Sequence, residues 1–321
     1  MRPRAAVLGS PISHSLSPAI HAAAYAYLGL DWEYTRVELR PEEFLGFVDG
    51  LDDSWRGLSV TMPLKEVAAS CGVPDEDVRL TGVANTVVLG GQRRVYNTDI
   101  PGLTDALAAS GLPRLRVATL IGNGATARSV VVALARGGVR LIEVQGRNPE
   151  RLAAFREWAE RLGVEVQPRT LGAPLDPASE LLVSTVPSAG LDGRLDSLEV
   201  EYCPALRGVF DVIYHPWPTP LAARAESAGR MVLNGLDLLA HQARYQVRLM
   251  TGQDVPAEVL LSAVRAASAA PASSPMSASS ATAFRARRIP WSRSAASARC
   301  FACPISCRSA WAVAATSCSI R

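Results

Sequence analysis

The stretch that decides the fold is LRVATLIGNGATARSVVVALARG, residues 115–137. It begins as an apolar strand, turns through glycines and continues with the periodicity of a helix. Gly122 and Gly124 would allow a tight turn and a close approach of the backbone to a pyrophosphate. The first helical turn then offers free N–H groups and the positive end of the helix dipole to phosphate oxygens. This order favours a dinucleotide site over a packing turn. We assign the cofactor contacts of the turn to Gly122, Asn123, Gly124, Ala125 and Thr126.

The residues after this turn repeat the pattern of strand and helix. A helix is expected over residues 148–162, and apolar strands are expected over residues 139–147, 163–169, 179–187 and 208–214. Such a rhythm is typical of a parallel sheet with helices on both faces. We therefore predict a Rossmann-type doubly wound domain over residues 104–235.

The first hundred residues alternate strands and helices in a different way. A helix should begin at Ser17-Pro18, since proline is preferred at the first helical position. A hairpin is expected around Gly90-Gly91. Further strands are predicted over residues 4–9, 32–39 and 57–62, and further helices over residues 41–49 and after Pro63. We predict an α/β substrate domain over residues 1–103, completed by helices within residues 236–270.

Charge is distributed unevenly along the 321 residues. Residues 271–321 carry +7 and residues 1–270 carry −4, which together give the net charge of +3. The mildly acidic body removes the obvious reason to expect a nucleic-acid partner. No apolar run approaches the roughly 18 residues of a membrane helix, and the N-terminus does not resemble a secretory signal. We expect a cytoplasmic enzyme with no membrane association, either a monomer or a homodimer.

The C-terminal segment differs in kind from the body. Residues 271–321 have no acidic residue and no sustained periodicity, which predicts a disordered, low-complexity tail. Their abrupt change of composition suggests a non-native reading, such as a frameshift. Cys300, Cys303 and Cys307 have a spacing like that of metal ligands, but no second ligand pair or histidine is near, so no metal is expected. Two cysteines of the body, Cys71 and Cys203, indicate inert thiols in a reducing compartment.

The end of the second strand of the predicted Rossmann domain distinguishes NAD from NADP. Glu143 lies too early and should be inside the strand, whereas Arg147 stands at its tip and Arg151 one helical turn later. An arginine at this place suits the 2′-phosphate of NADP, so NADP is the predicted cofactor. The alternative is that Arg147 is only an exposed surface cation.

Lys65 is the only lysine in a chain with 33 basic residues. Arginine keeps its proton in proteins, whereas lysine can act as an acid or a base. A single lysine therefore suggests a site where arginine will not serve, although drift of composition could also leave one lysine. Polar residues at the predicted element ends could ligate a polyhydroxylated acid, while each alone is more often a cap or turn residue. They include Ser15, Ser17, Thr61, Asn85 and Asp99.

Six motifs in sequence order resemble those of the shikimate dehydrogenase family. They are GSPISHSLSP (9–18), LSVTMPLK (58–65), GVANT (82–86), NTDIPGL (97–103), FDVIYHPWPTPL (210–221) and NGLDLLAHQA (234–243). The resemblance covers residues 5 to about 265. It implies reversible, NADP-dependent reduction of 3-dehydroshikimate to shikimate, on the route to chorismate and the aromatic amino acids.

The resemblance also implies roles for individual residues. Lys65 would be the catalytic acid and base, with Asp99 beside it. The small-molecule substrate would be bound by Ser15, Ser17, Thr61, Lys65, Asn85, Asp99, Tyr214 and Gln242. Residues from Gly122 to Thr126 would hold the pyrophosphate. The adenosine phosphate would meet Gly146, Arg147, Asn148 and Arg151, and the nicotinamide side would be lined by Val212 and Gly235.

Several positions depart from the family pattern. Ser59 stands where the family usually has Asn, which would shorten one substrate contact or bridge it through water. The other departures are Asn123 and Ala125 in the glycine turn, the order Gly146-Arg147-Asn148, and the segment Ser184-Thr185-Val186-Pro187. Two alternatives therefore stay open. One is an enzyme of the same architecture that acts on quinate or uses NAD, and the other is a cofactor-binding protein without activity.

Overall fold

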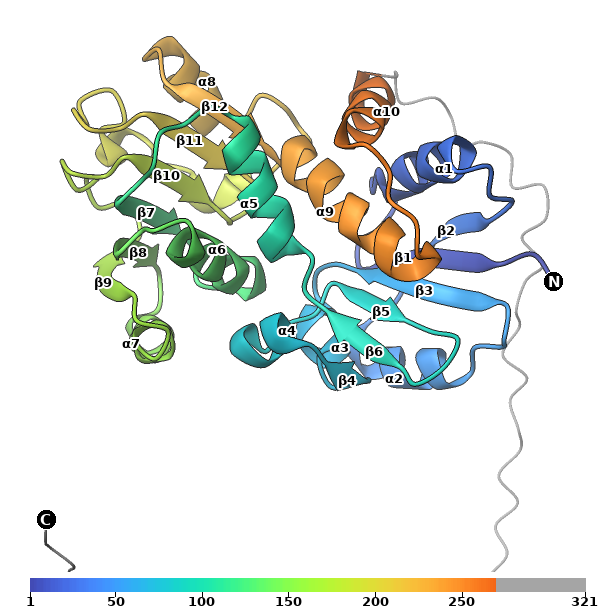
Figure 1. Ribbon diagram of the computed structural model, residues 1–321. Coiled ribbons are helices and arrows are strands. Elements are labelled where there is room, and N and C mark those ends of the chain that lie inside the picture. Colours follow the sequence, from blue (N-terminus) through green and yellow to red (C-terminus); the bar gives the residue numbers. More distant parts are fainter. Residues whose placement is uncertain (270–321) are drawn as a thin grey trace, which may run out of the picture. The chain divides into compact units, whose positions relative to one another are not determined.

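The computed structural model describes residues 1–269, and their strands form two six-stranded sheets (Figure 1). The first sheet has the order β2-β1-β3-β5-β6-β4. Its strands are β1 (Arg4–Gly9), β2 (Glu33–Glu38), β3 (Trp55–Val60), β4 (Val73–Pro74), β5 (Thr86–Val88) and β6 (Arg94–Tyr96). β1 is parallel to β2 and β3, whereas β5 is antiparallel to β3 and β6. The hairpin predicted around Gly90-Gly91 is thereby confirmed.

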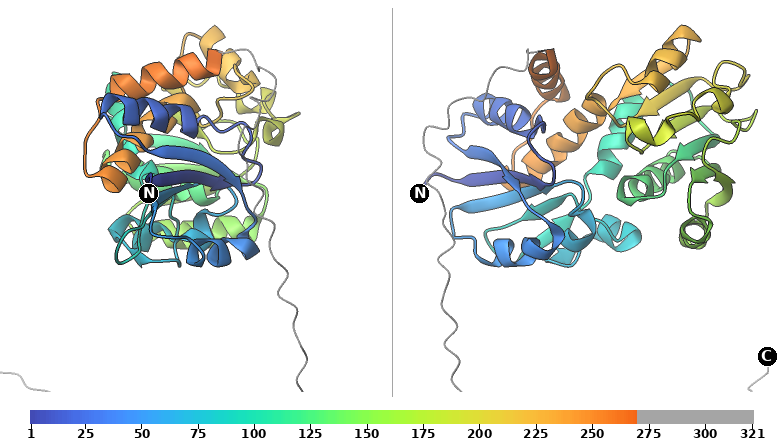
Figure 2. Two further views of the ribbon diagram at one scale, coloured as in Figure 1. Left: turned by 90° about the vertical axis from the view of Figure 1, so that its right-hand side faces the viewer. Right: turned by 180° about the vertical axis from the view of Figure 1, so that it is seen from behind.

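Helices cover both faces of this sheet (Figure 2). One face packs against α2 (Pro41–Asp49), α3 (Lys65–Ala68) and α4 (Glu76–Thr81). The other face carries α1 (Ser17–Tyr27), α9 (Gly235–Thr251) and α10 (Ala257–Ala269). The helix predicted at Ser17 begins there with Pro18 in its first turn, but no side chain caps it. The helix predicted after Pro63 is the single turn α3.

The second sheet is parallel throughout and has the order β9-β8-β7-β10-β11-β12. Its strands are β7 (Val117–Ile121), β8 (Leu141–Gly146), β9 (Glu165–Thr170), β10 (Leu181–Ser184), β11 (Gly208–Asp211) and β12 (Met231–Asn234). β8 and β9 lie on one side of β7, and β10, β11 and β12 follow on the other side. This is the strand order of a doubly wound Rossmann fold, with its switch point between β7 and β10. The predicted fold class is confirmed.

Two groups of elements cover the second sheet. α5 (Asp99–Ala109), α6 (Ala125–Arg136) and α7 (Pro149–Glu160) pack into one apolar core with β7 and β8. α8 (Pro220–Ser227) and the 3-10 turns Ser188–Leu191 and Asp196–Leu198 enclose a second core with β10 and β11. Asn148 caps α7 by accepting a hydrogen bond from the amide of Arg151. The helix predicted from Asn148-Pro149 therefore forms as its cap sequence indicates.

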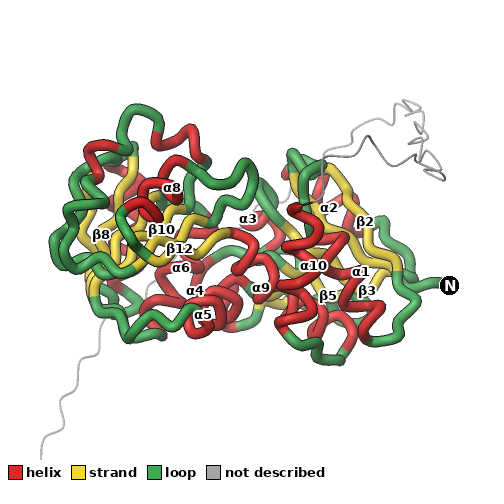
Figure 3. The backbone as a smooth tube through the Cα atoms, turned by 90° about the horizontal axis from the view of Figure 1, so that it is seen from above, coloured by secondary structure: helices red, strands yellow, loops and turns green. Residues whose placement is uncertain are grey.

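Helix α9 joins the two sheets. It continues directly from β12 of the second sheet and packs on β3 and β5 of the first, and Figure 3 shows it between them. Two glycines allow the close approach. A Cβ atom on Gly102 of α5 would lie 2.7 Å from the backbone nitrogen of Gln242, and one on Gly57 would lie 2.6 Å from Met250. Hence α9 approaches α5 too closely for a side chain at Gly102, and the Met250 side chain of α9 fills the space beside Gly57 of β3.

Other predictions concern single residues or the tail. Cys71 and Cys203 are free and buried, as predicted for inert thiols, and burial raises the pKa of the Cys71 thiol to about 11. The predicted tail, residues 271–321, including Cys300, Cys303 and Cys307, lies outside the described residues. Over residues 1–269, no helix has both the length and the apolar character needed to cross a membrane.

His21 of α1 lies in a buried aromatic cluster. Its ring stacks on Tyr34 at 3.9 Å between centroids, and its Nε2 lies 3.3 Å from Oε1 of Gln246. Burial disfavours the charged imidazole more than this hydrogen bond favours it, and it lowers the pKa of His21 from 6.5 to about 4. The folded protein therefore keeps His21 neutral at pH values where the unfolded chain binds a proton.

Replacing Gly102 by alanine should destabilise the fold. The new methyl group would meet the backbone of Gln242, so we expect Gly102→Ala to lower the free energy of unfolding by about 1–3 kcal/mol. The matched control is Gly46→Ala in the exposed middle of α2, where nothing lies within 4 Å of an added Cβ. This control should raise stability by up to about 1 kcal/mol. Urea unfolding of both variants measures the difference, and equal midpoints would contradict the predicted contact.

Stability should fall as the pH drops from 6.5 towards 4 because of His21. Its pKa is lowered on folding, so the unfolded state binds the extra proton in this window and stability rises with pH. Each pKa unit corresponds to about 1.4 kcal/mol, so His21 should remove about 2 kcal/mol at pH 5 relative to neutral pH. The control is His21→Gln, which has no titrating group there. Urea unfolding at pH 7.5 and pH 5 should show a smaller acid loss in this variant, and an equal loss would exclude His21 as the cause.

Candidate active site

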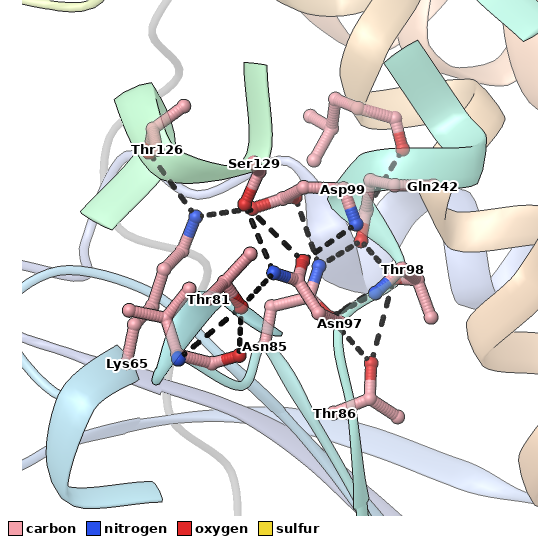
Figure 4. A network of polar contacts seen from close by, with 12 residues as sticks. Lys65, Thr81, Asn85, Thr86, Asn97, Thr98, Asp99, Thr126, Ser129 and Gln242 are labelled. Carbon is pink, nitrogen blue, oxygen red and sulfur yellow. Dashed lines mark hydrogen bonds and ion pairs between the residues drawn. The ribbon is translucent and has the colours of Figure 1, made fainter. Parts of the chain in front are cut away.

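The side chain of Lys65 lies at the start of α3, where the first sheet faces the glycine turn of the second. α3 follows the cis peptide bond Met62-Pro63. Lys65 Nζ donates to Oδ2 of Asp99 at 2.6 Å and to Oγ1 of Thr126 at 3.3 Å (Figure 4). The lysine side chain is 13% exposed and that of Asp99 is 9% exposed. A nearly buried ion pair therefore lies directly against the first residues of α6.

Asp99 is the first residue of α5, and both of its carboxylate oxygens are engaged. Oδ2 accepts from Lys65, and Oδ1 accepts from Nδ2 of Asn85 at 2.9 Å. The backbone amide of Asp99 donates to Oδ1 of Asn97. Because a buried charge needs a partner and saturated hydrogen bonds, these contacts explain how the pair can be kept out of water.

The carboxamide of Asn85 has a defined orientation. Its Oδ1 accepts from the backbone amide of Thr98 at 2.8 Å, and a backbone N–H can only donate. The opposite atom, Nδ2, must then be the nitrogen that donates to Asp99 and, at 3.3 Å, to Oε1 of Gln242. Gln242 reaches this place from α9. Four predicted site residues, Lys65, Asn85, Asp99 and Gln242, are thus brought into one network.

Elements of the two sheets meet around this network. Nδ2 of Asn97 donates to Oγ of Ser129 on α6 at 3.0 Å. Farther out, Nε1 of Trp158 on α7 donates to the carbonyl oxygen of Leu80 on α4 at 2.8 Å. The catalytic candidates therefore lie at a junction fixed by contacts from both sides.

The other predicted substrate residues have hydrogen-bond partners outside the ion pair. Oγ of Ser15 accepts from the amide of Ser17, and the carbonyl of Ser15 accepts from Arg36. Thr61 precedes the turn of α3, and its carbonyl accepts from Leu64. Within residues 1–269, no side-chain hydrogen bond links Ser15, Ser17, Thr61 or Tyr214 to the ion pair.

Loops from the two sheets meet where Ser15 and Tyr214 lie. The rings of His14 and His215, next to these residues in sequence, stack at 5.5 Å between centroids. Burial raises the pKa of Tyr214, and the backbone at Leu16 partly offsets that effect. Tyr214 thus lies beside the loop of Ser15 and Ser17, which supports grouping the three residues on one side of the site.

The predicted pyrophosphate turn has the geometry that its glycines require. Gly122 has a φ of +102°, and a Cβ there would lie 2.5 Å from Oγ1 of Thr185. Gly124 precedes α6, and a Cβ on it would enter open space. The backbone at Gly124 is therefore open to an approaching group, and the first turn of α6, with Ala125 and Thr126, presents its N–H groups there.

A cavity of about 480 Å³ opens beside this turn. Its lining includes Asn123, Gly124, Arg128 and Arg151. Arg128 is held by an ion pair of 3.1 Å with Glu66, the neighbour of Lys65 in sequence. An open backbone and two guanidinium groups suit the phosphates of a dinucleotide, so these residues fit the predicted cofactor.

The residues predicted for the adenosine phosphate follow β8. Gly146 ends the strand, and a Cβ on it would lie 2.9 Å from Leu152 of α7. Arg147, Asn148 and Arg151 come next and are exposed. Glu143, predicted to be inside the strand, is 3% exposed and lies 3.6 Å from Arg169. Within residues 143–148 the one acidic side chain, Glu143, is therefore inside the strand and not at its tip, as the sequence predicts for NADP.

Val212 and Gly235, predicted for the nicotinamide side, lie next to each other. A Cβ on Gly235 would be 2.1 Å from the carbonyl oxygen of Val212 and 3.0 Å from the ring of Tyr214. Only glycine can therefore begin α9 at this distance from the chain after β11. This contact also brings Tyr214 to the same end of the second sheet.

Ser59, one of the departures from the family pattern, points into the protein. It is 3% exposed, accepts from the hydroxyl of Tyr34 at 2.6 Å and donates to Gln246 at 2.7 Å. Its hydroxyl is thus occupied by internal partners, which differs from the expected short or water-bridged substrate contact. Thr98 and Ser129 complete the network. Thr98 belongs to the polar residues at predicted element ends that could ligate a polyhydroxylated acid, whereas Ser129 has no role in the prediction, because only tertiary packing brings it there.

Known proteins resemble the chain over both sheets. It matches the family models of the shikimate dehydrogenase substrate binding domain over residues 7–87 and of the shikimate 5′-dehydrogenase C-terminal domain over residues 235–265. It is 39% identical over 251 residues to the shikimate dehydrogenase (NADP(+)) of Methylobacterium radiotolerans, covering 75% of this chain and 88% of the relative.

Solved structures agree with this match. Shikimate dehydrogenase of Mycobacterium tuberculosis is 39% identical with a TM-score of 0.74, covering 82% of this chain and 99% of that one. The enzyme of Thermus thermophilus in complex with NADP(H) and shikimate is 32% identical with a TM-score of 0.72, covering 83% and 99%. On the sequence identity and the coverage, the chain belongs to the shikimate dehydrogenase family.

Proposed function

We propose that the protein catalyses the reversible, NADPH-dependent reduction of 3-dehydroshikimate to shikimate, a step towards chorismate and the aromatic amino acids. The observation that carries this proposal is the position of Lys65, whose Nζ is 2.6 Å from the Asp99 carboxylate and 3.3 Å from Thr126 of the cofactor turn. A proton donor beside a dinucleotide turn is what reduction of a ketone requires. The relative from Thermus thermophilus, solved with NADP(H) and shikimate, supports the choice of substrate and cofactor.

Lys65 would donate one proton in the reduction and accept it in the oxidation. NADPH, when bound, supplies the hydride that adds to the carbonyl carbon. Negative charge then develops on the carbonyl oxygen, where Lys65, as an ammonium group, stabilises it and donates the proton that completes the hydroxyl. In the oxidation, neutral Lys65 takes that proton back. Asp99 orients the amine, because its Oδ2 accepts from Nζ while Asn85 holds its Oδ1.

The remaining predicted residues are assigned to binding. Ser15, Ser17, Thr61, Asn85, Tyr214 and Gln242 would bind the substrate, which the meeting of the His14 and His215 loops supports. The pyrophosphate would lie at residues 122–126, and the 2′-phosphate near Arg147 and Arg151.

We further assign the two parts of the site to two domains. The substrate domain would comprise residues 1–103 with the helices of 236–270, since α1, α9 and α10 share one apolar core. The NADP domain would comprise residues 104–235, which contain the second sheet. The free thiols of Cys71 and Cys203 support a reducing compartment, and we place the protein in the cytoplasm.

The direct test is an absorbance assay at the NADPH band with 3-dehydroshikimate, and in reverse with shikimate or quinate. Consumption of NADPH with 3-dehydroshikimate is expected, together with a preference for shikimate over quinate. A protein that binds NADPH but turns over none of these compounds would overturn the proposed function.

Lys65→Ala and Lys65→Arg should both lower kcat by about 10² to 10⁴, because removal of a general acid and base has that typical effect. Arginine keeps the charge but cannot release its proton. Shikimate binding, followed by calorimetry, should persist, and circular dichroism should show an intact fold. Turnover of Lys65→Arg at the wild-type rate would remove Lys65 from the mechanism.

Arg147→Ala should raise KM for NADPH much more than KM for NADH, since the two cofactors differ only in the 2′-phosphate. The matched control is Arg161→Ala, which removes the same charge at the exposed C-terminal end of α7. This control should leave both constants near their wild-type values. If Arg147→Ala changed both KM values equally, Arg147 would not read the 2′-phosphate.

A further inference from the structure

Helix α9 carries two buried glutamines one turn apart, Gln242 and Gln246. Residues four apart lie on one face of a helix, so both side chains reach towards Asn85. Gln242 belongs to the motif that resembles the family, whereas Gln246 lies beyond it and received no role from the sequence. It is 2% exposed, and each of its polar atoms has a partner within the first sheet.

The contacts of Gln246 define its orientation. Nε2 donates to the backbone carbonyl of Asn85 and to Oγ1 of Thr86, both at 3.1 Å. Since a carbonyl oxygen can only accept, this side of the carboxamide must be the nitrogen. Oε1 then accepts from Ser59 at 2.7 Å and faces Nε2 of His21 at 3.3 Å.

Through Thr86, Gln246 adds a further constraint on Asn85, whose carboxamide the Thr98 amide already orients. The Thr86 hydroxyl accepts from Gln246 and donates to Oδ1 of Asn85 at 2.9 Å. Oδ1 also accepts from Thr98, so its acceptor capacity is used and Nδ2 faces Asp99. Each residue of this series thus donates to the next: Gln246 to Thr86, Thr86 to Asn85, and Asn85 to the carboxylate of Asp99, which accepts from Lys65.

We infer that Gln246 is a positioning residue for the Lys65–Asp99 pair, acting through Thr86 and Asn85. It contacts neither member of the pair and is not itself catalytic. The inference rests on the proposed function, because it assigns Gln246 a part in orienting the same proton donor. Without Gln246, the Thr86 hydroxyl can turn away and the backbone of Asn85 loses one of its donors.

The decisive comparison is between Gln246→Leu and Ser59→Ala. Leucine is similar in size and removes both donors to Asn85 and Thr86. Ser59→Ala removes a buried hydrogen bond on the opposite side of the same carboxamide and leaves Nε2 in place. We expect Gln246→Leu to lower kcat about tenfold with KM for NADPH unchanged, and Ser59→Ala to keep kcat within about twofold of wild type. Both variants should lower Tm, because each loses a buried hydrogen bond.

The single lysine of the chain gives a readout that needs no turnover. Protein labelled with ¹³C at lysine Cε has one lysine side-chain signal, that of Lys65. The signal should move in Gln246→Leu, since the carboxylate beside the amine is displaced, and should keep its position in Ser59→Ala. If Gln246→Leu does not fold, Gln246→Met serves instead. Methionine is uncharged and similar in size to glutamine and has no donor for Thr86, so we expect the same loss of kcat.

The outcomes distinguish a failure of the inference about Gln246 from a failure of the proposed function. If the glutamine variants match Ser59→Ala in kcat and in the lysine signal, Gln246 has only a structural role and the inference is wrong. If the wild-type protein turns over no 3-dehydroshikimate but the signal still moves in Gln246→Leu, the proposed function fails while the positioning of Lys65 by Gln246 stands.

Discussion

The ion pair between Lys65 and Asp99 sets the conditions that the surrounding structure must meet. Two charges so largely withdrawn from solvent are tolerated only when they are close together and their remaining polar atoms are satisfied. Here the carboxylate accepts from Lys65 on one oxygen and from Asn85 on the other. Asn85 is fixed in turn by the backbone amide of Thr98, which can donate a hydrogen bond but cannot accept one. Groups of the protein itself therefore hold the carboxylate beside the amine.

The fold delivers these groups at the ends of its elements. Lys65 begins α3, Asp99 begins α5, and Asn85 immediately precedes β5. The second sheet contributes Thr126 from the first turn of α6, directly after the glycines that leave its backbone open. The proposed proton donor and the predicted cofactor turn thus lie next to each other, because each follows the end of a strand where a helix begins. This is the usual location of ligand sites in open α/β sheets.

The parts of this structure that are local in sequence could be predicted from it. The Rossmann strands, the cap of α7 at Asn148 and the hairpin at Gly90-Gly91 each follow from a few adjacent residues. The single lysine and the family motifs also indicated Lys65 and Asp99. The brevity of α3 and the inward direction of Ser59 were not predictable, because both depend on packing against distant segments.

The role of Gln246 was not predictable for the same reason, because its contacts also depend on distant segments of the chain. Its partners Asn85 and Thr86 lie about 160 positions earlier in the chain, and nothing in the neighbouring sequence marks that contact. A spacing of four between two glutamines on an otherwise apolar helix face was the available signal. This spacing points to a contact with Asn85 only once α9 is known to lie on β3 and β5.

The position of α9 has a consequence for how the protein is made. Synthesis proceeds from the N-terminus, so the whole first sheet leaves the ribosome before the residues of α9 exist. Until then Asn85 lacks both glutamines and one face of the sheet lacks its central helix. The strands of the second sheet are all encoded between residues 117 and 234, and the last of them directly precedes α9. The contacts of Asn85 with Gln242 and Gln246 can therefore form only after the strands of both sheets have been synthesised.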